Sequence, residues 1–172
     1  MTVIKTDPSF SELSWVTSVI SKEKDRQRYS GLHVASGIAY ATDGRRIHRS
    51  PITDIPDGDY TVTKPAASII TLEPRPKPLP NIVKFFDIDP TQYNKHLISF
   101  PATKKPGDQS RQYSIALSRL FRALSPILLD ITFIEYLIGH RYTVYILKSK
   151  AENTPIVFKS TYRGLVIMPF RP

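Results

Sequence analysis

The sequence predicts an α+β fold in which helices pack on one face of antiparallel sheets. Three observations support this class. Two turn signals divide residues 31 to 51 into three short strands, and an amphipathic helix pattern begins at Phe10. A second helix followed by strand patterns, from residue 113 to residue 168, repeats the order of the first half. With 172 residues the chain is long enough to bury a core of its own.

The first helix follows a short strand pattern at residues 2 to 6. It begins either at Asp7-Pro8 or after Ser9, which forms a capping box with Glu12 three residues later. Trp15 falls near the apolar side of the helix, which favours a core position over a base-stacking one. Helical spacing places four residues on that side: Phe10, Leu13, Val16 and Ile20.

The strands between residues 31 and 51 are separated by Ser36-Gly37 and Asp43-Gly44. Alternating apolar residues flank both pairs, as expected for an antiparallel meander. An Asp-Gly pair also supplies the positive φ angles of a type I′ turn. The second turn therefore presents residues 42 to 46 at its tip.

Less regular segments follow the meander. A turn at Asp57-Gly58 precedes a strand at residues 59 to 63, and residues 66 to 72 form a short helical or apolar segment. Residues 73 to 80 carry proline at every second position, which predicts a stiff, extended connection.

In the second half of the chain, we predict several strands and one long helix. Strands are predicted at residues 82 to 88 and 95 to 100, and a loop at residues 101 to 111. Residues 113 to 124 form a helix with Arg119 and Arg122 on its basic side. Its apolar side contains Ile115, Leu117, Leu120, Phe121 and Leu124. Further strands are predicted at residues 129 to 138, 142 to 148, 156 to 159 and 162 to 168.

The charge balance favours a polyanionic partner. The net charge is +9, and such an excess promotes nucleic-acid binding without sequence specificity. The absence of cysteine excludes disulfides and thiolate metal sites. No apolar run approaches the roughly 18 residues needed to span a bilayer, and the N-terminus lacks a signal-peptide core. We therefore expect a cytoplasmic protein without membrane contact.

No catalytic constellation is evident in the sequence, so we expect no enzyme activity, no cofactor and no metal. The four histidines are scattered along the chain. Asp87 and Asp89 are the one candidate pair for a magnesium ion in a nuclease. Their apolar flanks favour a strand end before a turn instead.

Three segments resemble bacterial sliding clamps, the β subunit of the replicative DNA polymerase. Residues 41 to 47, A-T-D-G-R-R-I, resemble the clamp segment A-T-D-G-H-R-L. Residues 10 to 31 resemble a clamp helix and its following loop, with Arg28-Tyr29 ahead of a strand that starts with glycine. Residues 164 to 171 resemble the clamp carboxyl terminus, a strand that runs into Met-Pro-Met-Arg. The three matches occur in family order and cover about half of the chain, but none falls in the stretch from 72 to 110.

The resemblance implies a DNA-clamp-like fold and a DNA polymerase processivity factor in DNA replication. Such a protein contacts or encircles double-stranded DNA non-specifically and tethers polymerase or clamp-loader peptides in an outer pocket. Carried over, the pocket comprises Thr42, Gly44, Arg45, Arg46, Ile47, Val166, Met168, Pro169, Phe170 and Arg171. The DNA-binding residues are Lys22, Lys24, Arg26, Arg28, Tyr29, Arg119 and Arg122. Arg45 replaces the family's histidine, and Pro172 its terminal leucine, so peptide preference can differ.

Domain organisation has two interpretations. Residues 1–172 form a single clamp-like domain with a proline-rich insertion at about 72–110, or residues 1–100 form a clamp domain and 101–172 a half-domain. Clamp rings contain about six domains, so a ring of this chain requires several copies, and we expect a homo-oligomer. A third possibility is a clamp-like protein that never closes a ring. The alternative function is a clamp-like interaction module that competes for clamp-binding peptides without encircling DNA.

Overall fold

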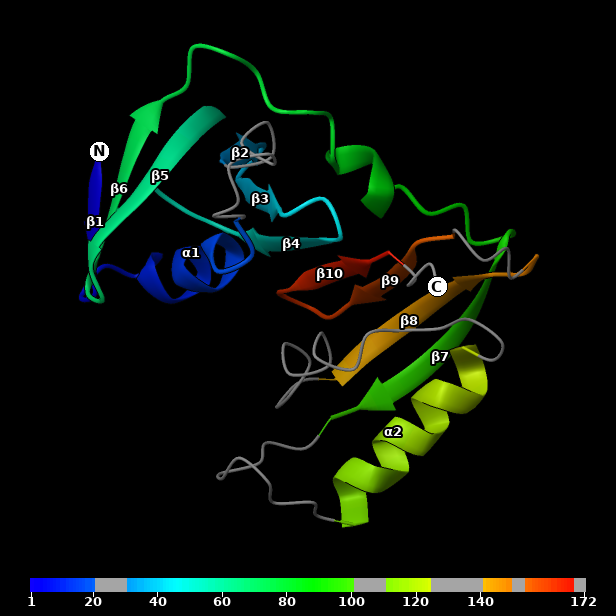
Figure 1. The fold of residues 1–172 in the computed structure, drawn as a ribbon. Coiled ribbons are helices and arrows are strands. Elements are labelled where there is room, and N and C mark those ends of the chain that lie inside the picture. Colours follow the sequence, from blue (N-terminus) through cyan, green and yellow to red (C-terminus); the bar gives the residue numbers. More distant parts are fainter. Residues whose placement is uncertain (21–30, 101–110, 125–140, 150–153, 169–172) are drawn as a thin grey trace. The chain divides into compact units, whose positions relative to one another are not determined.

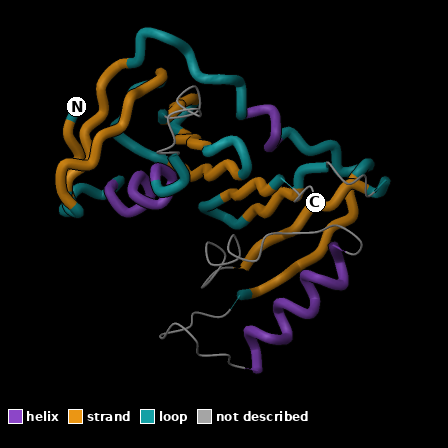
Figure 2. Tube along the Cα trace, in the orientation of Figure 1, coloured by secondary structure: helices purple, strands orange, loops and turns teal. Residues whose placement is uncertain are grey.

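The computed structural model describes residues 1–20, 31–100, 111–124, 141–149 and 154–168 (Figure 1). The chain divides into two compact units. The first contains Met1–Lys84 and Tyr162–Leu165, and the second contains Phe85–Thr161 and Val166–Pro172. Each unit combines antiparallel strands with one described α-helix, which confirms the α+β class (Figure 2). The domain boundaries expected from the sequence stay a prediction.

The first unit is a twisted antiparallel sheet that carries helix α1 (Phe10–Thr17), which packs against β3 and β4. Its strand order is β1-β6-β5-β2-β3-β4. The strands are β1 (Thr2–Ile4), β2 (Leu32–Ala35), β3 (Ile38–Thr42), β4 (Arg46–Pro51), β5 (Gly58–Ala66) and β6 (Ile69–Pro74). The core is apolar, with Leu13 and Val16 of the helix buried among Leu32, Val34 and Leu72 of the sheet. The expected meander and the apolar side of the helix are thus confirmed.

The two meander turns differ in type. Ser36 and Gly37 have φ angles of 52° and 71°, as a type I′ turn requires. At the second turn, Thr42 pairs with Ile47, so the loop is longer than two residues. Of the Asp43-Gly44 pair, Gly44 has the positive φ, 85°. The expected type I′ turn is therefore wrong at this position, because the Asp43 side chain organises a wider turn.

Two further expectations for the first unit are corrected. Ser9 stands at the N-cap of α1 but makes no side-chain cap bond, and its hydroxyl donates instead to the Thr53 carbonyl at 2.8 Å. Glu12 forms its side-chain bonds with residues far away in the chain. The segment from Ala66 to Leu72 is not helical but turns into β6, which lies between β1 and β5.

In the second unit, four strands carry one longer helix. The strand order is β10-β9-β8-β7, and α2 lies alongside β7 (Figure 1). The elements are β7 (Tyr93–Ser99), α2 (Arg111–Leu124), β8 (Arg141–Leu147), β9 (Ile156–Lys159) and β10 (Gly164–Ile167). Leu120 and Leu124 of the helix are fully buried, as are Tyr142 and Phe158 of the sheet, whose rings meet edge to face. Along the chain, β10 begins in the first unit and ends in the second.

The predicted strand at residues 82 to 88 is wrong. Val83–Phe86 form a 3₁₀ turn, η2, with Ile82 and Phe86 both buried. Strand alternation would place Lys84 on the same side as Ile82 and Phe86, but Lys84 is exposed, so burial does not alternate along this segment. The strand expected at 129 to 138 and residues 101 to 110 of the expected loop lie outside the described residues. Arg111, the last residue of that loop, instead begins α2. Among the described helices, none combines the length and the apolar character needed to cross a membrane.

Candidate binding surfaces

The turn between β3 and β4 is built from its own polar side chains. Asp43 Oδ1 accepts hydrogen bonds from the backbone N–H groups of Arg45 and Arg46, both at 2.9 Å. Asp43 Oδ2 pairs with Arg46 Nε at 3.0 Å. The Thr42 hydroxyl accepts from the Gly44 N–H and donates to the Arg46 carbonyl. These bonds fix the backbone and leave Arg45 exposed at the tip.

The residues expected in a peptide pocket differ in exposure. Thr42, Ile47 and Val166 are buried. Gly44 and Arg45 are exposed, whereas Arg46 and Met168 are half-buried. The turn belongs to the first compact unit, whereas Val166 and Met168 belong to the second. Pro169, Phe170 and Arg171 lie outside the described residues, so the pocket stays a prediction.

An ion pair between Glu12 and Arg163 joins α1 to the start of β10 within the first unit. Arg163 donates to both carboxylate oxygens, from Nε and from Nη2, each at 2.9 Å. The Ser50 hydroxyl on β4 also donates to Glu12. A two-pronged arginine–carboxylate pair is among the strongest polar contacts in proteins. The Glu12 carboxylate therefore connects α1 to two segments that are distant in sequence, one through Ser50 and the other through Arg163.

Trp15 and His48 stack beside this ion pair. Their ring centroids lie 4.3 Å apart with an interplanar angle of 16°. The Arg163 guanidinium lies over the Trp15 ring at 4.9 Å from its centroid. His48 is fully buried, with Nδ1 3.1 Å from the Trp15 carbonyl oxygen. Burial lowers the pKa of His48 from 6.5 to about 4, so this histidine is neutral in the folded protein at physiological pH.

The expected DNA-binding residues divide into two groups. Lys22, Lys24, Arg26, Arg28 and Tyr29 lie outside the described residues. Arg119 and Arg122 are both exposed on α2, on the side away from buried Leu120 and Leu124. Phe121, expected on the apolar side, is 42% exposed. The basic side of this helix is confirmed as a feature of its surface, but its contact with DNA stays a prediction.

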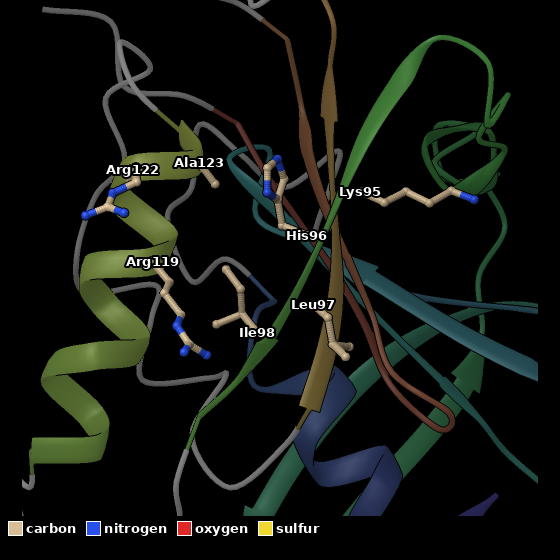
Figure 3. A pocket seen from close by; sticks show the side chains of 7 residues that line it. All are labelled: Lys95, His96, Leu97, Ile98, Arg119, Arg122 and Ala123. Atoms are coloured by element: carbon tan, nitrogen blue, oxygen red, sulfur yellow. The ribbon is translucent and has the colours of Figure 1, made fainter.

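A groove of about 430 Å³ lies between β7 and α2 in the second unit (Figure 3). Among the described residues that line it, the ionisable ones are all basic: Lys95, His96, Arg119 and Arg122. His96 and Ile98 extend from β7 on the side of the helix, whereas Lys95 and Leu97 extend from the opposite side of the strand (Figure 3). Arg119 reaches toward Ile98 from the helix. The helix thus places two arginines beside a concave surface that the strand lines with His96 and Ile98.

Asp89, one of the two aspartates considered for magnesium, has a local structural role. Asp89 accepts hydrogen bonds from the backbone N–H and hydroxyl of Thr91 and from the Gln92 amide. The hydrogen bonds from Thr91 lower the pKa of the Asp89 carboxyl. Asp89 thus organises the turn that precedes β7. Within the described residues, no cluster of three or more metal-ligating side chains occurs.

Sequence reasoning missed the Glu12–Arg163 pair and the role of His96 in the groove. The two members of the pair are 151 positions apart, and no local pattern connects them. A weak signal existed for His96, because strand alternation places it on the same side as Ile98. The position of that side relative to α2 depends on tertiary packing.

Known proteins resemble this chain in fold rather than in sequence. No family model matches the sequence, and no curated protein matches it. Solved structures do match over the whole chain. A DNA polymerase III β chain from Streptococcus pneumoniae TIGR4 superposes with a TM-score of 0.59 at 10% identity, and the match covers 100% of this chain. A DNA polymerase sliding clamp from Bacillus subtilis gives 0.55 at 11% identity and also covers 100%.

A third structure, a Helicobacter pylori β clamp bound to a DNA ligase peptide, gives a TM-score of 0.56 at 8% identity and covers 99% of this chain. The chain spans less than two thirds of these proteins, 64% of the first two and 66% of the third. This chain therefore has the fold of bacterial sliding clamps, which confirms the resemblance at the level of fold.

Proposed function

We propose that the protein is a sliding-clamp-like processivity factor. It contacts or encircles duplex DNA non-specifically and holds a polymerase through a bound peptide. The observation that carries this proposal is the fold match over the whole chain to several sliding clamps. The net charge of +9 supports a polyanionic partner, since binding releases the counterions of DNA.

The proposed DNA contact is electrostatic and uses Arg119 and Arg122. Both are exposed on a helix whose other side is anchored in the core, so they can meet phosphates without unfolding anything. Phosphate contacts carry no sequence information, which suits a protein that must move along any DNA. Lys22, Lys24, Arg26, Arg28 and Tyr29 are proposed to add to this contact.

The proposed peptide contact uses the β3–β4 turn with residues 166 to 171. One neighbour in fold is a clamp bound to a DNA ligase peptide. Arg45 is exposed at the tip of the turn and suits an acidic flank of such a peptide. Arg45→Glu with Met168→Ala is expected to weaken a clamp-binding peptide about tenfold in fluorescence anisotropy. Unchanged affinity would remove these residues from the pocket.

The proposed assembly is a homo-oligomer. The chain contains two compact units, and we propose that each takes the place of one of the about six domains of a clamp ring. Three copies then close a ring. Light scattering at several concentrations, with and without duplex DNA, measures the absolute mass. A trimer supports the ring, whereas a monomer under all conditions favours the alternative, an interaction module that competes for clamp-binding peptides.

A further inference from the structure

The groove between β7 and α2 has a chemistry that a DNA contact alone does not use. Its floor is apolar, with Ile98 2% exposed and Ala123 half-buried. Its sides are basic, with His96 on the strand and Arg119 on the helix (Figure 3). Arg122 adds a second arginine to the lining, whereas the Lys95 side chain extends from the opposite side of β7 (Figure 3). A ligand that fills this space needs negative charge beside a small apolar group.

We infer that the groove binds an acidic segment of a partner protein, with a carboxylate on Arg119 and an apolar side chain on Ile98 and Ala123. A carboxylate matches the planar guanidinium with two parallel hydrogen bonds. The volume of about 430 Å³ lies in the range of small ligand sites and accommodates a few side chains of an extended peptide.

The shape of the site decides between a peptide and duplex DNA. A duplex is stiff and presents its phosphates on a convex surface, so it reaches exposed arginine tips but not the floor of a groove. An extended peptide alternates its side chains and can place one inside. Duplex DNA gains nothing from Ile98 and Ala123, whereas the apolar side chain of a peptide is buried there.

A regulatory consequence follows, and it rests on the proposed DNA contact. A carboxylate on Arg119 neutralises its charge and repels a phosphate nearby, so an acidic segment in the groove weakens duplex binding. The reciprocal effect has the same size, because coupling between two ligands is symmetric.

The test uses the full chain and a fluorescent peptide in which glutamates flank a single leucine. The matched control peptide has glutamine in place of each glutamate. Arg119→Gln removes the carboxylate partner and is expected to weaken binding about tenfold. Ala123→Leu fills the floor without changing charge and is expected to weaken it comparably. Lys148→Gln removes one exposed charge outside the groove, and about twofold or less is expected.

Equal losses in Arg119→Gln and Lys148→Gln, or unchanged binding in Ala123→Leu, overturn the inference. So does a single-stranded oligonucleotide that binds in place of the peptide and is lost in Ala123→Leu. Duplex binding is measured on the same variants, with circular dichroism as the folding control. Ala123→Leu is expected to retain duplex binding, whereas Arg119→Gln lowers it. Duplex binding that Arg119→Gln leaves unchanged counts against the proposed function alone.

Discussion

The two α-helices in the described part of the chain are held to their sheets in different ways. In the first unit, α1 combines an apolar side with a polar contact, in which the Glu12 carboxylate bonds to Arg163 and Ser50. In the second unit, α2 is anchored by Leu120 and Leu124 and exposes Arg119 and Arg122. The first helix uses its charge inside the unit, and the second presents its charge to partners.

This difference implies that the charged residues of α1 serve stability, whereas those of α2 serve binding. Polar substitutions beside α1 are expected to change the free energy of unfolding of the first unit. Substitutions on the basic side of α2 are expected to change binding and leave stability nearly unchanged. Because Trp15 is the single tryptophan of the chain and lies in the first unit, its fluorescence reports on that unit specifically.

The largest effect on stability is expected when the pH is lowered. Burial lowers the pKa of His48 from 6.5 to about 4, so between these pH values the unfolded chain binds a proton that the folded chain does not. The contribution of neutral His48 to the free energy of unfolding is fully present above about pH 6.5. It is lost as the pH falls toward 4, which lowers the free energy of unfolding by about 3 kcal/mol. Urea unfolding followed by Trp15 fluorescence measures this loss. His48→Gln serves as the reference, and parallel pH profiles of the two proteins would contradict the assignment.

A smaller effect is expected from the Glu12–Arg163 pair. Glu12→Gln removes a charged hydrogen-bond acceptor and leaves the Arg163 guanidinium without its carboxylate, at a cost of about 2 kcal/mol. The matched control is Glu73→Gln, because Glu73 is exposed in the same unit. We expect a change within about 0.5 kcal/mol there. If both variants unfold at the same urea concentration, the pair does not hold α1.

The smallest effect on stability is expected on α2. Arg119→Glu with Arg122→Glu lies on an exposed surface and is expected to change the unfolding free energy by less than about 0.5 kcal/mol. DNA affinity should fall, and the slope of its logarithm against that of salt concentration should decrease by about 2. An unchanged slope in a salt titration would remove this helix from the DNA contact.

Sequence patterns predicted the parts of the fold that depend on local signals. The turn at Ser36-Gly37 fixes the first hairpin, and β9 (Ile156–Lys159) has the predicted bounds. The patterns failed where a distant partner decides. Val83–Phe86 form a 3₁₀ turn although their segment has strand-like composition, and residues 69 to 74 form a strand because β1 and β5 lie beside them.

The candidate sites follow the same rule. Sequence alone identified Arg119 and Arg122 as the basic side of a helix, because residues three positions apart on a helix share a face. It assigned Glu12 to a capping box, whereas Arg163, which is remote in the chain, binds this carboxylate. The groove beside β7 requires the packing of strand and helix, which no spacing in the sequence encodes.

Retention on circular DNA tests the central claim most directly. The protein is bound to a nicked circular plasmid, half of the sample is linearised with a restriction enzyme, and both halves are gel-filtered at high salt. A protein that encircles DNA stays on the circle, where charge contacts are screened, and slides off the linear ends. We predict retention on circular DNA and loss from linear DNA. Equal retention, or equal loss, on the two forms would contradict topological binding.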